Sequence, residues 1–234
     1  MSITTKTVDY AQGGQTYEGY LALPAGTPKA VVVVAHAWGG LSDFEKAKAE
    51  LLASWGYAGF AMDVYGKGNR GETNEECEAL MTPLASNRPE LQSRLANSLN
   101  VAKAESGASK AAAIGFCFGG LSVLDMARTN MAVEGVASFH GLFGAPGNTA
   151  DKIKPKVLAL HGYDDPMAKP EDMIAFASEM TKAGADWQIH AYGGTLHAFT
   201  NPAAQNPDFG TQYKAEADRR SFAACKDFLE ELFG

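Results

Sequence analysis

The stretch that decides the fold of this chain is AIGFCFGG, residues 113–120. It follows an apolar run that predicts a strand over 110–114, and it precedes a segment that predicts a helix over 121–128. A glycine-x-nucleophile-x-glycine sequence between a strand and a helix is typical of a nucleophile elbow. Glycine at 115 and 119 makes room for a tight, strained turn that exposes the side chain of Cys117.

The predicted place of Cys117 suits a reactive thiol. A sulfur at the first turn of a helix lies at the positive end of the helix dipole, which favours the thiolate. The alternative is that Cys117 is a small buried residue, since free cysteines are commonly buried. The strand before it and the helix after it favour the nucleophile.

The rest of the sequence alternates between strand and helix patterns. Residues 31–35, VVVVA, form a continuous β-branched run that is typical of a strand buried on both faces. This alternation predicts an α/β fold with a mainly parallel central sheet and helices on both faces, and 234 residues fit one domain, 1–234. The predicted strands are 5–10, 16–22, 31–35, 57–62, 110–114, 133–139, 156–160 and 187–192; the predicted helices follow Ser42, cover 74–84, 88–104 and 121–128, start at Pro170, and close the chain over 217–232.

The helix after Ser42 carries two readable signals. Ser42 and Glu45 have the spacing of a capping box, in which each side chain binds the backbone of the other. An apolar stripe predicts the face that packs on the sheet, and its members are Phe44, Ala47, Leu51 and Trp55.

Composition narrows the classes of partner. A net charge of −7 argues against nucleic acid and anionic membranes, and no run of about 18 apolar residues predicts a membrane span. The three cysteines are widely spaced and include no Cys-x-x-Cys pair, so we expect neither disulfides nor a metal site. The polar N-terminus lacks a signal-peptide core, and we expect a cytoplasmic protein with a small-molecule substrate. The sequence leaves the oligomeric state open.

Two later motifs supply a base and an acid for Cys117. In hydrolases with an elbow of this kind, the nucleophile, the acid and the histidine follow one another in the chain. His197 comes directly after the last predicted strand, and Asp164 and Asp165 come directly after the strand before it. We predict that His197 is the base and that Asp165, held extended by Pro166, orients it; Asp164 stays the alternative acid.

An oxyanion site is expected beside the nucleophile. The backbone N–H of Phe118, the residue after the nucleophile, is one expected donor, and the loop HAWGG, residues 36–40, offers a second from Trp38. Aromatic residues near the predicted strand ends could line an acyl pocket or simply pack in the core, and they include Tyr65, Phe143 and Phe199.

These residues together resemble the dienelactone hydrolase family. The resemblance covers nearly the whole chain and rests on GFCFGG (115–120), HGYDDP (161–166), LHAFTNP (196–202), DVYG (63–66) and the loop that begins at His36. It implies an α/β-hydrolase fold, no cofactor, and a triad of Cys117, His197 and Asp165. It also places His36, Ala37 and Asn201 among the expected pocket residues.

The chain departs from the family at two of these positions. The family often has a glutamate where this chain has Ala37, and the type enzyme has a substrate-binding arginine where this chain has Asn201. The resemblance therefore implies that His197 alone activates Cys117 and that an anionic dienelactone is a poor substrate, unless Arg70 or Arg88 supplies positive charge.

Three functions follow as hypotheses. The first is hydrolysis of a small lactone or carboxylic ester through a thioester on Cys117. The second is cleavage of another acyl bond, or of a carbon–carbon bond next to a carbonyl, by the same triad. The third is a catalytically silent protein in which Cys117 senses oxidation.

Overall fold

The computed structural model describes residues 2–234. The chain consists of two compact units, Met1–Ile114 and Gly115–Gly234. Strand β5 (Ala111–Phe116) runs across the boundary, and its entire length is buried.

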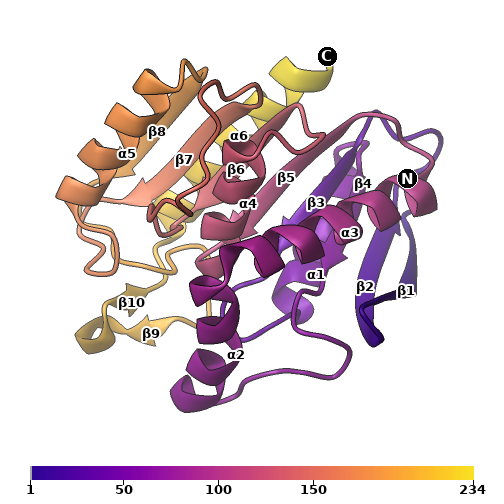
Figure 1. Ribbon diagram of the computed structural model, residues 1–234, viewed down its shortest axis with the longest axis horizontal. Helices are drawn as coiled ribbons and strands as arrows, with labels where there is room; N and C mark the ends of the chain where they lie inside the picture. The colour runs from indigo at the N-terminus through magenta and orange to yellow at the C-terminus, as the bar shows by residue number, and fades with distance from the viewer. Residues whose placement is uncertain (1) are drawn as a thin grey trace. The chain divides into compact units, whose positions relative to one another are not determined.

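The first unit joins an antiparallel pair of strands to a parallel pair. Its strand order is β1-β2-β4-β3, and β3 pairs with β4 in parallel with Val33 beside Phe60. Every residue of β3 and β4 is buried, as the β-branched sequence of 31–35 predicts. The elements are β1 (Thr4–Gln12), β2 (Gln15–Leu23), β3 (Val31–Ala35), α1 (Asp43–Ser54), β4 (Ala58–Met62), α2 (Asn74–Ser86) and α3 (Arg88–Ser106) (Figure 1).

Helix α1 shows one wrong prediction and its cause. Ser42 and Glu45 do form the capping box, but the predicted stripe is not the buried face, since Ala47 is exposed. The Glu45 carboxylate also accepts a hydrogen bond from the backbone N–H of Ala37, 3.2 Å away, which turns this polar residue inward. The buried residues of α1 are Glu45, Ala49, Leu52 and Ala53.

The second unit consists of parallel strands with helices on both faces. Strands β6, β7 and β8 pair in parallel in that order. Figure 1 shows α4 and α5 on the near face of these strands and α6 behind them. The elements are α4 (Phe118–Arg128), β6 (Gly135–Phe139), β7 (Lys156–Gly162), α5 (Pro170–Lys182), β8 (Trp187–Tyr192), β9 (Gln205–Asn206), η1 (Pro207–Phe209), β10 (Thr211–Gln212) and α6 (Ala215–Phe233).

The predicted α/β class with mostly parallel strands is confirmed, and the differences are local. Helix α2 continues through Pro83 to Ser86 instead of ending near the proline. The segment between the last predicted strand and the closing helix contains a small hairpin of β9 and β10. Its strands are two residues long, too short for a periodic pattern to reveal them.

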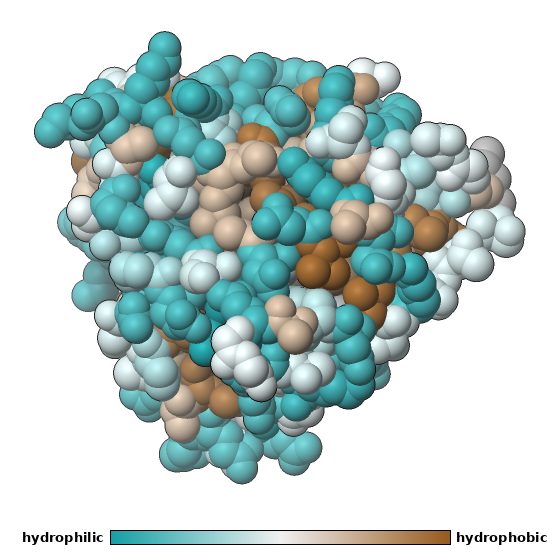
Figure 2. Space-filling view, turned by 45° about the vertical axis from the view of Figure 1, so that its right-hand side comes forward, coloured by the Kyte–Doolittle hydropathy of each residue, from teal (hydrophilic) through white to brown (hydrophobic). Residues whose placement is uncertain are grey.

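The surface of the chain carries few large apolar groups. Among residues 2–234, no helix combines the length and hydropathy that crossing a lipid bilayer requires. The face in Figure 2 is mainly hydrophilic, with smaller hydrophobic patches between the polar side chains. The exposed large apolar side chains of the described residues are Tyr163, Met167, Ile174 and Phe209.

Candidate active site

The turn at Cys117 has the strained geometry that its glycines predict. Cys117 has φ 55° and ψ −114°, values that L-residues rarely adopt, and α4 begins at the next residue. A Cβ atom on Gly115 would lie 2.1 Å from the carbonyl oxygen of Gly119. Only glycine fits at 115, because the backbone of the helix start occupies the space of a side chain.

A second glycine closes the turn from the other side. A Cβ atom on Gly120 would lie 2.6 Å from Gly141 Cα and 2.7 Å from the side-chain oxygen of Ser138. These contacts bring the first turn of α4 against the end of β6, so the backbone around residue 117 is held by packing on both flanks.

The Cys117 side chain is a half-buried free thiol. Its backbone N–H is shared between two acceptors, the carbonyl oxygen of Phe139 at 3.1 Å and Nδ1 of His140 at 3.2 Å. The loop after β6 therefore fixes the backbone of Cys117. The other two cysteines, Cys77 and Cys225, are buried free thiols, and burial raises the pKa of Cys225 to about 12.

His197 is held in place by its backbone and by its ring. Its N–H donates to the carbonyl oxygen of Gly210, and its carbonyl accepts from the N–H of Gln212, next to the small hairpin. Its ring nitrogen Nδ1 lies 2.6 Å from Oδ2 of Asp165, and the whole residue is 2% exposed. This contact fixes the orientation of the ring.

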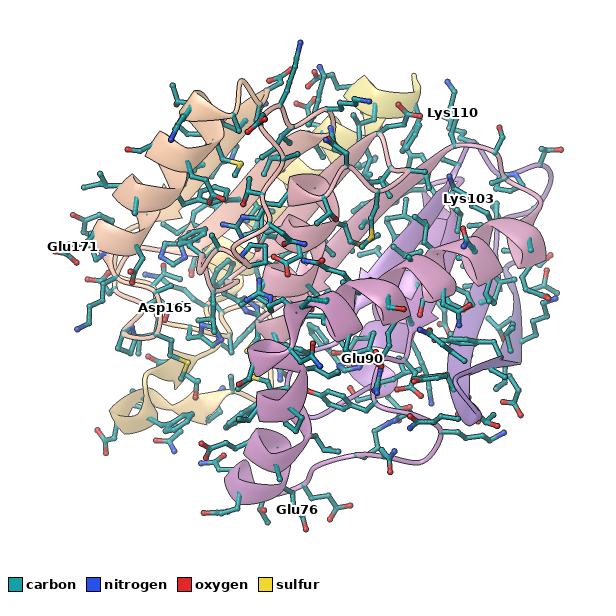
Figure 3. All side chains as sticks on the ribbon, viewed as in Figure 1. Glu76, Glu90, Lys103, Lys110, Asp165 and Glu171 are labelled. Atoms are coloured by element: carbon teal, nitrogen blue, oxygen red, sulfur yellow. The ribbon has the colours of Figure 1, made fainter. Side chains whose placement is uncertain are left out.

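The structure separates the two adjacent aspartates. Asp165 is buried, accepts the N–H of Met167 at 2.8 Å with its other oxygen, and contacts His197. Asp164 binds the backbone N–H of Thr195 at 3.1 Å instead. Figure 3 shows Asp165 among the loops that follow β7, whereas Glu171 at the start of α5 points outward.

His197 is charged by its neighbours. Burial works to lower its pKa, but the charge of Cys117 and the hydrogen bond to Asp165 outweigh burial and raise the pKa of His197 to about 10. Nε2 has no well-aligned hydrogen bond within residues 2–234. Cys117 therefore acts on His197 through its charge and not through a well-aligned hydrogen bond.

A second histidine lies against the first. The rings of His140 and His197 meet edge to face with centroids 5.1 Å apart, and Phe199 contacts His140 at 5.2 Å. Nε2 of His140 lies 2.9 Å from the hydroxyl of Thr200. Phe199 and Thr200 are fully buried and follow His197 closely in the chain, so this loop packs on His140.

The predicted oxyanion loop, residues 36–40, belongs to the first unit and is held by hydrogen bonds to its neighbours. Ala37 binds Glu45 as described, and the hydroxyl of Tyr65 donates to the carbonyl oxygen of Trp38 at 3.0 Å. His36 is 1% exposed, with Nδ1 2.7 Å from the Ala37 carbonyl oxygen and the N–H of Val64 3.3 Å from Nε2. Burial lowers the pKa of His36, although Ala37 and the nearby carboxylates act in the other direction.

The remaining predicted pocket residues take different positions. Phe118 is the buried first residue of α4, and Phe199 packs against His140 and Tyr192. Asn201 is half-buried, and its side-chain oxygen accepts the N–H of Ala203. Phe143 stacks on Phe176 and meets the tilted ring of His161. It lines a cavity of about 540 Å³ whose lining includes none of the three predicted triad residues.

Two features of the site were not predicted. The spacing of His140 and Thr200 gives no sign of their contact, because 60 residues separate them. The capping-box spacing predicts only a helix-cap role for Glu45, although this residue also binds the backbone N–H of Ala37. Within residues 2–234, no cluster of His, Cys, Asp and Glu has the arrangement of a metal site.

Comparison with known proteins gives a consistent picture. The sequence pattern of the dienelactone hydrolase family matches residues 17–233. A protein of Aquifex aeolicus that is provisionally named a carboxymethylenebutenolidase is 28% identical, with 83% of this chain and 86% of the relative covered. A protein of Saccharolobus solfataricus with the same provisional name is 27% identical, with 97% of this chain and 98% of the relative covered.

Solved structures extend the likeness to three dimensions. A dienelactone hydrolase-like promiscuous phosphotriesterase from metagenomic libraries is 33% identical, with a TM-score of 0.93 and 100% of both chains covered. A provisionally named dienelactone hydrolase from Klebsiella pneumoniae is 20% identical, with a TM-score of 0.80 and with 96% of this chain and 97% of that chain covered. This second likeness shows that the two chains share a fold.

Proposed function

Because the chain belongs to the dienelactone hydrolase family, and is thus an ester or lactone hydrolase, we propose that Cys117 is its nucleophile, with His197 as base and Asp165 as orienting acid. The observation that carries this proposal is the environment of His197. His197 is a buried histidine tied to a carboxylate at 2.6 Å, and Cys117 helps to keep it charged. A thiolate paired with an imidazolium is the form in which a cysteine attacks a carbonyl.

Acylation begins at the sulfur. The thiolate of Cys117 attacks the carbonyl carbon, and the carbonyl oxygen takes up the negative charge. The N–H of Phe118 at the start of α4 is the donor that we assign to this oxyanion, and Trp38 remains the predicted second donor. The carbon–oxygen bond to the leaving group then breaks, and His197 gives its Nε2 proton to the departing alkoxide. A thioester on Cys117 remains.

Deacylation reverses the roles. With the sulfur acylated, the imidazole of His197 is neutral, and Nε2 takes a proton from a water molecule that attacks the thioester. The carbon–sulfur bond breaks, and the acid product leaves as Cys117 regains its negative charge and His197 its proton. Asp165 stays ionised and holds the ring through both steps.

The substrate class follows from the two departures from the family pattern. Ala37 and Asn201 carry no charge, and Asn201 uses its side-chain oxygen on Ala203. We therefore propose a small substrate with a neutral acyl group. A neutral phosphotriester is a second candidate, favoured by the likeness to the metagenomic phosphotriesterase over the full length of both chains.

The test is hydrolysis of 4-nitrophenyl acetate, a neutral lactone, an anionic lactone and a neutral phosphotriester. We expect turnover of neutral carboxylic substrates, and we expect Cys117→Ala to lower kcat/KM by on the order of 10⁴-fold or more. Cys225→Ala, which alters a buried thiol on α6, is the matched control and keeps its activity.

Two results would overturn the proposal. One is unchanged hydrolysis in Cys117→Ala. The other is a wild-type protein that turns over none of the four substrates while Cys117 oxidises readily, which is the behaviour of a thiol sensor.

A further inference from the structure

His140 lies between the two loops that carry the proposed nucleophile and base. It follows β6 directly and is 2% exposed, with a φ of 39° that side-chain-bearing residues seldom adopt. One ring nitrogen faces the backbone N–H of Cys117 at 3.2 Å, and the other faces the hydroxyl of Thr200 at 2.9 Å. A strained backbone angle at such a place indicates that the surroundings hold this residue there.

The partners of His140 determine its protonation state. The backbone N–H of Cys117 can only donate, so Nδ1 of His140, which shares this N–H with the carbonyl oxygen of Phe139, acts as an acceptor and carries no proton. A neutral imidazole has one proton, which must then be on Nε2, where it donates to the Thr200 hydroxyl. A doubly protonated ring would lose its contact with Cys117 and would place a second cation beside charged His197.

We propose that His140 is a positioning residue, which fixes Cys117 and His197 relative to each other; this role rests on the proposed function of these two residues. Through Nδ1 it holds the backbone of Cys117 together with the Phe139 carbonyl, and through Nε2 it holds Thr200, three residues beyond His197. Its ring also supports the His197 ring at 5.1 Å. A misplacement of about 1 Å between reacting groups costs on the order of 100-fold in rate, so such a brace has a direct effect on kcat.

The decisive variants are His140→Gly and His140→Asn. Both residues tolerate a positive φ, so neither adds backbone strain, but only asparagine brings an acceptor to the place of Nδ1. We expect His140→Gly to lower kcat roughly 10- to 100-fold with a much smaller change in KM, and His140→Asn to recover most of the loss. His190→Asn, on strand β8, is the control and leaves kcat unchanged. Equal loss in the glycine and asparagine variants would overturn the role of Nδ1.

A second pair keeps the test decisive if the glycine variant does not fold. Thr200→Ser retains the hydroxyl, whereas Thr200→Val removes it at nearly constant volume. We expect a loss of kcat in the valine variant and near-normal kcat in the serine variant. Equal activity in the two would contradict the link through Nε2.

Two further readouts do not require turnover. Nitrogen NMR of the wild-type protein at pH 7 should show His140 neutral with its proton on Nε2, and a proton on Nδ1 would overturn the inference. Alkylation of Cys117 by iodoacetamide should slow in His140→Gly and recover in His140→Asn. Wild-type protein without esterase turnover would count against the proposed function, whereas active protein with unchanged alkylation in His140→Gly would count against His140.

Discussion

His197 and His36 both follow strands directly or closely, and both are almost fully buried, yet their surroundings shift their pKa values in opposite directions. His36 binds backbone groups, the carbonyl of Ala37 and the N–H of Val64, and burial lowers its pKa. His197 contacts a carboxylate and a thiol, and its pKa rises to about 10 despite burial. Burial alone makes a neutral, structural histidine, whereas a charged partner in direct contact makes a histidine that holds a proton.

We expect the largest effect from removing the carboxylate of Asp165, which is the charged partner that His197 has and His36 lacks. In Asp165→Asn we expect kcat to fall by on the order of 10³- to 10⁴-fold, because the amide no longer stabilises the charged ring or fixes its orientation. Asp164→Asn is the matched control, since Asp164 binds the N–H of Thr195 and not His197, and its kcat should fall by less than about tenfold. Steady-state kinetics on one neutral ester compares the two, and similar losses would contradict the assignment of Asp165.

The pH dependence of the free enzyme sharpens the comparison. Because the pKa of His197 is raised from 6.5 to about 10, the proton that acylation needs is present below that value and is lost as the pH rises through it. We expect kcat/KM for a neutral ester to stay level from pH 7 to about 9 and to fall as the pH approaches 10. A profile with its midpoint near 6.5 would mean that His197 behaves like an ordinary histidine.

The anchor of the His36 loop gives the smallest expected effect. Glu45 accepts hydrogen bonds from the N–H of Ala37 and from both the N–H and the hydroxyl of Ser42. We expect Glu45→Gln to lower the free energy of unfolding by about 1–2 kcal/mol, since one of its acceptor oxygens becomes a donor that faces other donors.

A matched control for Glu45 exists at the other capping box of the chain. Glu76 binds the backbone of Thr73 at the start of α2 and is exposed, as Figure 3 shows at the outer end of that helix. Urea unfolding should give a smaller loss for Glu76→Gln, because water replaces the lost contact. Equal losses in the two variants would show that Glu45 acts only as a helix cap.

The sequence predicts the parts of the site that depend on local geometry. The turn at Cys117 follows from its glycines and its place between strand and helix, and the positions of His197 and Asp165 follow from chain order and strand ends. Pro166 favours Asp165 over Asp164 as the acid, because a residue before a proline is held extended, and the structure brings Asp165 to within 2.6 Å of His197.

The parts that sequence reasoning missed depend on contacts between distant segments. His140 meets Cys117 and Thr200 only once the strands are aligned, and no spacing rule encodes that contact. The sequence predicts the wrong buried face for α1, because the hydrogen bond from the Ala37 N–H turns Glu45 inward, against the preference of a carboxylate for water.

Mass spectrometry of the intact protein and of its peptides tests most directly whether Cys117 carries the acyl group during turnover. Wild-type protein is quenched with acid during hydrolysis of a slowly released neutral ester and then digested. We expect one acyl group per chain, on the peptide that contains Cys117, and no adduct in Cys117→Ala. Continued turnover with an unmodified Cys117, or an acyl group on another residue, would contradict this expectation.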